Sequence, residues 1–198
     1  MTSAAAVPSA NPSRRAGPQR LRRLLLGLLW LFLACMVAAW AWQQPFMLRA
    51  RMLWGLARMP APSTLPVPVE GVLARRVADT FGAPRGTDRT HAGVDIFAPR
   101  GTPVVSATPG LVVSIRDGGL GGKQVWVLGP ARERHYYAHL DDWMPGLEQG
   151  DVVAPGEVLG FVGTTGNAKG TPPHLHYGVY GSAGAYDPLP LMRAGSTR

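Results

Sequence analysis

The stretch "TPVVSATPGLVVSIRDGG", Thr102 to Gly119, places short β-branched runs between Pro, Gly and Asp residues. β-branched residues favour strands, and the residues between them favour tight turns. Comparable runs follow at intervals of about ten residues, namely "GKQVWVLGP", "HYYAHLDDW", "GDVVAPGEVLGFVG" and "HLHYGVYG". This rhythm predicts an all-β, antiparallel, sandwich-like domain over residues 70–190, with no helix longer than two turns inside it.

The N-terminal third contains an uncharged apolar segment, "LLLGLLWLFLACMVAAWAW", over residues 24–42. At about 1.5 Å per residue it reaches roughly 28 Å, close to the hydrocarbon thickness of a bilayer. We expect a single transmembrane helix here. Residues 1–23 are expected to be a basic, disordered segment whose five arginines keep the N-terminus in the cytoplasm and send the domain across the membrane.

Two other interpretations of this segment stay open. Ala39-Trp40-Ala41 fits the cleavage site of a signal peptide, although the basic leader is long for one. Cys35 follows "LFLA" and loosely resembles a lipidation site, although the residues after it stay apolar. All three interpretations place the domain outside the cytoplasm.

The net charge of +8 is unevenly distributed along the chain. Residues 1–69 hold eight arginines and no acidic residue, whereas residues 70–198 hold twelve basic and twelve acidic residues. The expected domain therefore lacks the basic field that a phosphate backbone requires, and no nucleic-acid partner is expected.

Residues 43–69 are expected to connect the membrane helix to the domain. "QQPFMLRARMLWGLARM" predicts a short helix, which either lies on the bilayer surface or is a plain linker helix. "PAPSTLPVPV" predicts an extended spacer of about 30 Å. Residues 191–198 are expected to be a C-terminal tail.

The motif "THAGVDIF" places His91 four residues before Asp95. Gly93, the β-branched residues beside it and Pro99 argue against a helix. In a straight strand the two side chains would stand about 13 Å apart, so the chain must turn near Gly93 if both bind one ion. The alternative is a surface histidine and an aspartate that caps a turn.

In "PHLHYGVY", alternation along a strand places His174 and His176 on one face and Leu175 and Tyr177 on the other. The two histidines could bind one metal together, or one could bind it while the other reaches a substrate.

In "HYYAHLD", the same alternation places His135, Tyr137 and His139 on one face. His135 has no evident partner, and we interpret it as structural.

The motifs "HAGVD", "YAHL" and "HLHYGV", in this order, resemble the signature of the M23 peptidases, the lysostaphin-like or LytM-type zinc endopeptidases of bacterial peptidoglycan. The resemblance covers about residues 78–188. It implies a LytM-type domain in which His91, Asp95 and His176 bind one Zn²⁺, with a fourth position left for water. It also implies that His139 and His174 are catalytic, His139 as the general base and His174 at the oxyanion or the leaving amine, or with these roles exchanged.

We therefore predict a zinc-dependent endopeptidase that hydrolyses cross-links or stem peptides of peptidoglycan. Its partners would be peptidoglycan and the inner membrane, with the catalytic domain in the periplasm. Because some members of the family have lost ligands, the alternative is a catalytically silent module that binds the wall or activates an amidase. In this sequence no key position is missing.

A carrier domain with a lipoyl or biotinyl lysine is a further alternative from the Gly/Val-rich hairpins. Lys123 and Lys169 are the only lysines, neither has the expected apolar flanks, and a carrier would leave the histidines unexplained. Arg85, Arg89, Asn167 and Lys169 lie near the motifs, but we assign no role to them, and we interpret the two arginines as solvated charges.

Overall fold

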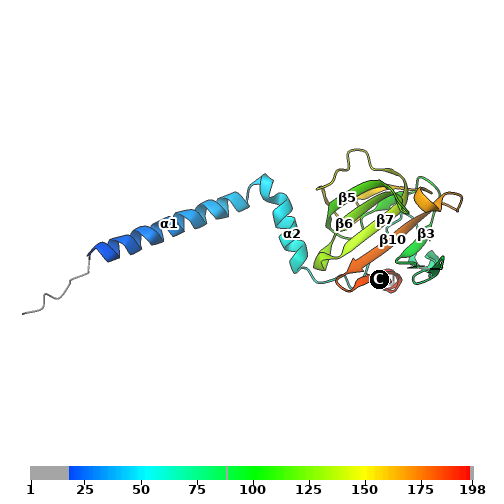
Figure 1. Cartoon of the computed structure of the whole chain (residues 1–198), viewed down its shortest axis with the longest axis horizontal. Helices are drawn as coiled ribbons and strands as arrows, with labels where there is room; N and C mark the ends of the chain where they lie inside the picture. The colour runs from blue at the N-terminus through cyan, green and yellow to red at the C-terminus, as the bar shows by residue number, and fades with distance from the viewer. Residues whose placement is uncertain (1–17, 88, 197–198) are drawn as a thin grey trace, which may run out of the picture. The chain divides into compact units, whose positions relative to one another are not determined.

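The computed structural model describes residues 18–87 and 89–196. The chain divides into two compact units, Met1–Met47 and Leu48–Arg198. The described part of the first unit is a long helix, α1 (Pro18–Trp42), followed by a 3₁₀ turn, η1 (Pro45–Met47) (Figure 1). Within α1, Gln19–Trp42 has a mean hydropathy of 2.4 and is long enough to cross a membrane. The expected N-terminal apolar helix is therefore present. Residues 18–23, which we expected to be disordered, belong to this helix, whereas residues 1–17 lie outside the described residues.

The second unit is built on one nine-stranded sheet and a separate two-stranded hairpin. The hairpin consists of β1 (Pro84–Arg85) and β2 (Arg89–Thr90). The strands of the sheet are β3 (Val94–Phe97), β4 (Pro103–Val105), β5 (Gly110–Gly118), β6 (Gly122–Leu128), β7 (Arg134–Trp143), β8 (Val152–Val153), β9 (Val158–Val162), β10 (His174–Gly181) and β11 (Gly184–Tyr186).

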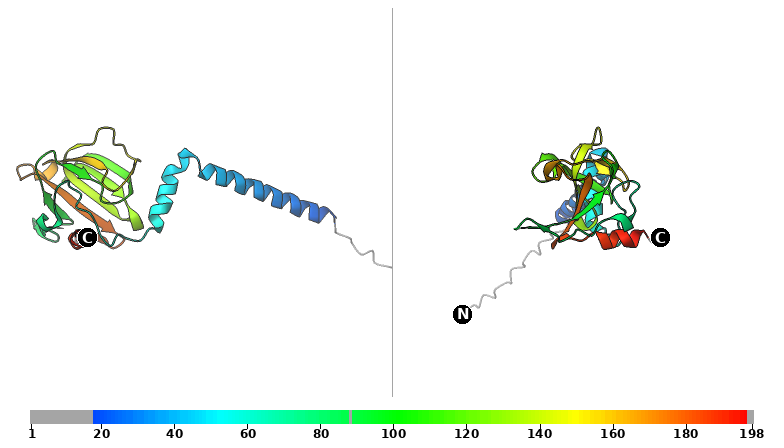
Figure 2. Two further views of the ribbon diagram at one scale, coloured as in Figure 1. Left: turned by 180° about the vertical axis from the view of Figure 1, so that it is seen from behind. Right: turned by 90° about the vertical axis from the view of Figure 1, so that its right-hand side faces the viewer.

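The main path of the sheet runs β11-β10-β7-β6-β5-β8, with β3 added on β10 and β9 joining β7 to β4. All of these pairs are antiparallel. Figures 1 and 2 show the long strands β5, β6, β7 and β10 side by side in one twisted sheet. The mostly antiparallel β fold is thus confirmed.

The first half of β10 lies between two neighbours, β3 on one side and β7 on the other. Its alternate residues Leu175 and Tyr177 are fully buried in the hydrophobic core, together with Val94 and Ile96 of β3. Burial of each such side chain contributes about 1.5–3 kcal/mol. The core therefore fixes the register of these strands, and with it the residues on the opposite face.

A helix lies where the sequence predicts one after the apolar segment, namely α2 (Leu48–Arg58). It belongs to the second unit: Leu56 is 1% exposed, and the Arg49 side chain donates to the carbonyl of Gly150 at 2.9 Å. The amide of Ala131 donates to the carbonyl of Met59 at 3.1 Å. α2 is thus packed on the domain and is not a free linker helix.

The proline-rich segment is not a free spacer over its second half. Leu65 is 1% exposed, and its amide donates to the carbonyl of Leu191. Val69 pairs with Val104 at the sheet. The physical reason is that Leu65 and Val69 are apolar and find room in the core, which the proline pattern alone does not reveal.

The described chain ends in a short helix, α3 (Leu189–Gly195), which contains the buried residues Leu189 and Met192. Residues 191–195, which we expected in a tail, are therefore helical. The remaining helical pieces are 3₁₀ turns, η2 (Ala74–Arg76), η3 (Pro130–Arg132) and η4 (Gly166–Ala168).

Candidate metal centre

The strand register brings the predicted site residues of β10 and β3 together. His176 is the direct neighbour of Asp95 on β3 and of Ala138 on β7. His174 and His176 both line a pocket on one face of the sheet. Leu175 and Tyr177 lie buried on the other face, so the alternation expected for "PHLHYGVY" is confirmed.

His91 reaches Asp95 because the chain turns between them, as the sequence required for a shared ion. The Nε2 atom of His91 lies 3.1 Å from Oδ1 of Asp95. Gly93 permits this turn because its backbone lies very close to β10. A Cβ atom at this position would stand 2.5 Å from the carbonyl oxygen of Tyr177 and 2.9 Å from Cε1 of His176. A side chain at this position would collide with the backbone of Tyr177 and with the ring of His176.

Three donor atoms converge on one point. His91 Nε2 lies 2.7 Å from His176 Nδ1, which in turn lies 3.2 Å from Asp95 Oδ1. For ligands at 2.0–2.1 Å around a tetrahedral zinc ion, the distance between ligand atoms is about 3.3 Å. Two ring nitrogens and a carboxylate oxygen aimed at one another form the donor set that a divalent cation satisfies, so the residues fit a zinc ion.

A loop residue, Thr80, holds two of these three ligands. The Nδ1 atom of His91 donates to the carbonyl of Thr80 at 2.7 Å, which leaves Nε2 free as a ligand atom. The hydroxyl of Thr80 accepts a hydrogen bond from the amide of Asp95 at 3.0 Å. Sequence reasoning missed Thr80 because nothing in "DTFG" indicates that this loop returns to His91.

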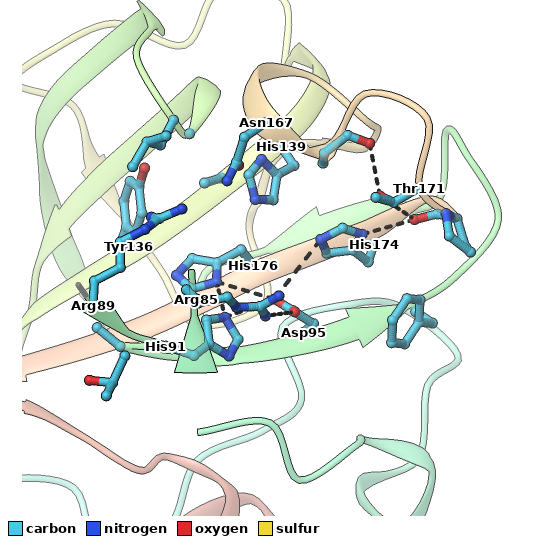
Figure 3. Close-up of a pocket in the computed structure, with 18 of the residues that line it drawn as sticks. Arg85, Arg89, His91, Asp95, Tyr136, His139, Asn167, Thr171, His174 and His176 are labelled. Carbon is cyan, nitrogen blue, oxygen red and sulfur yellow. Dashed lines mark hydrogen bonds and ion pairs between the residues drawn. The ribbon is translucent and has the colours of Figure 1, made fainter. Parts of the chain in front are cut away.

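The remaining two motif histidines face the same pocket. The Nδ1 atom of His174 donates to the carbonyl of Pro172 at 2.8 Å, and Nδ1 of His139 donates to the carbonyl of Thr165 at 2.9 Å. The ring centroids of His139 and His174 are 5.1 Å apart. Figure 3 shows both rings above His91, Asp95 and His176. The structure therefore brings all five predicted site residues together.

One expectation for β7 is wrong, because His139 does not share a face with His135 and Tyr137. Between Tyr137 and Leu140, β7 contains one residue more than its partner segment on β6, which is a β-bulge. His139 takes a left-handed backbone conformation there, with φ of 62°. The bulge reverses the alternation, so His135 and Tyr137 are buried in the core while His139 lines the pocket.

Burial controls the charge of the site. It lowers the pKa of His139 to about 4 and also lowers the pKa of His176. Burial alone would raise the pKa of Asp95, but its close contacts with the rings of His176 and His91 outweigh burial and hold that pKa well below its usual range. At neutral pH the rings of His139 and His176 are therefore neutral and Asp95 is ionised. A neutral imidazole and an ionised carboxylate are the metal-binding forms of these residues.

His135 lies outside the pocket, as the structural interpretation requires. It is fully buried, and its Nδ1 atom lies 2.8 Å from the hydroxyl of Tyr177. Burial lowers its pKa to about 4. Among the four residues left without a role, Arg85, Arg89 and Asn167 line the pocket, whereas Lys169 is absent from its lining. Arg85 is not the solvated charge that we expected, because it forms an ion pair with the buried Asp95.

Comparison with known proteins links this site to one family. The model of peptidase family M23 matches residues 89–188, about half of the chain. The chain is 38% identical over 140 residues to the L-Ala–D-Glu endopeptidase of Bacillus subtilis (strain 168), an alignment that covers 65% of this chain and 42% of that protein. The chain therefore spans less than half the length of this relative.

Two solved structures share the fold. The catalytic domain of lysostaphin from Staphylococcus simulans matches with a TM-score of 0.52 and 30% identity, over 59% of this chain and 91% of that one. A zinc-containing peptidase from Vibrio cholerae matches with a TM-score of 0.55 and 26% identity, over 66% of this chain and 40% of that one.

Proposed function

Since this chain belongs to peptidase family M23 and is a metallopeptidase, we propose that it is a zinc-dependent endopeptidase that hydrolyses peptide bonds in bacterial peptidoglycan. The observation that carries the proposal is the convergence of three donor atoms, of His91, Asp95 and His176, beside two further histidines in one pocket. A structural metal site is closed by four protein ligands, whereas three ligands and an open pocket suit catalysis.

The protein's own residues divide the work as follows. His91, Asp95 and His176 would hold the ion, which when bound supplies a Lewis acid and lowers the pKa of water. His139 takes the role of general base, because burial keeps its ring neutral and its Nδ1 atom is fixed by Thr165, so Nε2 can accept the proton of the attacking water. His174 faces the same space and supports the developing oxyanion or delivers a proton to the leaving amine.

In this mechanism water adds to the peptide carbonyl carbon and the carbon–nitrogen bond breaks. The proton taken from water ends on the leaving amine, so the step consumes one water and releases a carboxylate and an amine. The substrate we propose is a stem peptide or a cross-link of peptidoglycan, because the similar proteins include an L-Ala–D-Glu endopeptidase and lysostaphin.

We also propose that α1 anchors the protein in the inner membrane as a single-pass helix, with the N-terminus in the cytoplasm and the domain in the periplasm. Arg20, Arg22 and Arg23 lie in the first turns of α1, and the helix contains no acidic residue in the first turn. Basic residues at this end favour retention on the cytoplasmic side.

The test uses the full-length protein in detergent with purified, cross-linked peptidoglycan, and mass spectrometry of the soluble fragments. We expect fragments with new peptide termini that disappear with a chelator and return with zinc. A His139→Ala protein purified in parallel controls for contaminating hydrolases. If no wall preparation yields chelator-sensitive fragments, the enzyme proposal fails and the silent wall-binding or amidase-activating module is favoured.

A further inference from the structure

The β1–β2 hairpin at the rim of the pocket places two arginines opposite each other. Arg85 and Arg89 are direct cross-strand partners, and both side chains line the pocket. Like charges directly opposite on paired strands are destabilising. A destabilising pair of like charges beside a functional site indicates that the charges are retained for function at a cost in stability.

The two arginines differ in what they contact. Arg85 forms an ion pair with Oδ2 of Asp95. No ion pair joins Arg89 to any residue in the ranges 18–87 and 89–196, and Arg89 is exposed. Arg89 is therefore expected to have a different role from Arg85.

The described walls of the pocket offer Arg89 no counter-charge. Asp95 is the one acidic residue among the lining residues that the structure describes. Its Oδ2 is held by Arg85, and its Oδ1 faces His91 and His176. A bound divalent cation would make the pocket still more positive, so the occupant that balances it is an anion.

The neighbours of Arg89 suit a guanidinium that binds a ligand. Arg89, Tyr136 and His176 all line the pocket, and Figure 3 shows the Arg89 side chain extending toward Tyr136. Tyr136 belongs to an aromatic wall, with its ring stacked on Trp126 at a centroid distance of 4.2 Å and with Tyr180 beside Trp126 at 5.3 Å. Such a wall displaces water, which strengthens a charged hydrogen bond made next to it.

We propose that Arg89 binds a carboxylate of the substrate, so that the pocket selects stem peptides with a free carboxylate over uncharged peptides such as glycine bridges. A planar guanidinium matches a carboxylate with two parallel hydrogen bonds. The anion would also relieve the repulsion between Arg85 and Arg89. This inference rests on the proposed function, because it names the substrate class of the same site.

The test compares two synthetic stem peptides that differ only in a free α-carboxylate or its amide beside the scissile bond. In full-length, zinc-loaded protein we expect kcat/KM to favour the carboxylate by about 10- to 100-fold, as one charged hydrogen-bond pair allows. Arg89→Gln should reduce this preference to nearly one. Arg89→Lys should keep part of it, since the charge remains but the fork is lost.

Arg116→Gln is the matched control, because Arg116 is an exposed arginine on β5 that is not among the pocket-lining residues. Its preference for the carboxylate should equal that of the unaltered protein. An equal kcat/KM for both peptides in the unaltered protein, or an unchanged preference in Arg89→Gln, would overturn the proposal.

A binding measurement separates this inference from the proposed function. By calorimetry, the His139→Ala protein should bind the carboxylate peptide about 10- to 100-fold more tightly than the amide, and the added Arg89→Gln change should remove the difference. If the unaltered protein cleaves neither these peptides nor any wall preparation, the proposed function fails, while the comparison of Kd values still decides the role of Arg89. Equal Kd values for the two peptides in His139→Ala would refute the carboxylate site.

Discussion

Arg85 and Asp95 form an ion pair that divides the aspartate between two tasks. The guanidinium holds Oδ2, while Oδ1 of the same carboxylate lies 3.1 Å from His91 Nε2 and 3.2 Å from His176 Nδ1. The arginine thereby fixes the rotation of the carboxylate and directs one oxygen to the metal position. Partners of this kind orient the ligands of a metal site and tune its affinity.

Replacement of Arg85 should therefore weaken metal binding. We expect Arg85→Ala to raise the Kd for zinc about 10- to 100-fold, because the carboxylate is then free to rotate. The Kd of Arg85→Lys should lie between those of the unaltered protein and Arg85→Ala, since an ammonium keeps the charge but lacks the planar guanidinium. Competition with a chromophoric chelator measures these Kd values. Arg116→Ala serves as the control and should leave the Kd unchanged, because Arg116 is exposed on β5 and is absent from the pocket lining. Equal affinity in Arg85→Ala and the unaltered protein would contradict the orienting role.

The metal ligands and the catalytic base can be separated by two substitutions. His176→Ala should abolish stoichiometric zinc, because it removes one of three converging donor atoms. His139→Ala should retain one zinc per chain and lose roughly 10²- to 10⁴-fold in turnover, as expected for a lost general base. Elemental analysis with peptide cleavage assays measures both properties. Loss of zinc from His139→Ala with retention in His176→Ala would show that the roles are wrongly assigned.

Where a strand is regular, the local sequence pattern was sufficient to predict on which face each residue lies. The period of two correctly places His174 and His176 on the pocket face and Leu175 and Tyr177 in the core. The turn required at Gly93 was also predictable, because a straight strand cannot bring His91 to Asp95. In each case the relevant geometry lies within a few residues of the motif.

Long-range packing was not predictable in the same way. The bulge at His139 arises from the register between β7 and β6, so alternation placed this residue on the wrong face. Leu65 looked like part of a solvated spacer, yet it is buried against the residues of α3. The different surroundings of Arg85 and Arg89 depend on how the hairpin lies against Asp95, which no local pattern records.

The left-handed backbone of His139 predicts that stability and activity conflict at this residue. A φ of 62° costs a residue with a Cβ atom about 1 kcal/mol relative to glycine. His139→Gly should therefore be about 1 kcal/mol more stable than His139→Ala, although both variants lose the base and its activity. Urea denaturation in the presence of a chelator measures the difference. Equal free energies of unfolding for the two variants would show that the bulge is unstrained.

Buried His135 should make stability depend on pH in a defined window. Burial lowers its pKa to about 4 in the folded protein, whereas an unfolded histidine has a pKa of about 6.5. Between these values the unfolded state binds more protons, so the stabilisation is complete above pH 6.5 and is lost as the pH falls toward 4. The pKa difference corresponds to a loss of roughly 3 kcal/mol in the free energy of unfolding.

His135→Gln removes the titrating ring and keeps a group that can hydrogen-bond to Tyr177. We expect this variant to be less stable than the unaltered protein at pH 7. Between pH 7 and pH 4, however, its free energy of unfolding should fall by about 3 kcal/mol less than that of the unaltered protein. Urea denaturation of both proteins with chelator present, at several pH values, isolates this contribution because the other histidines are common to both. Parallel stability curves for the two proteins would contradict it and would mean that the ring of His135 can take up a proton without leaving the core.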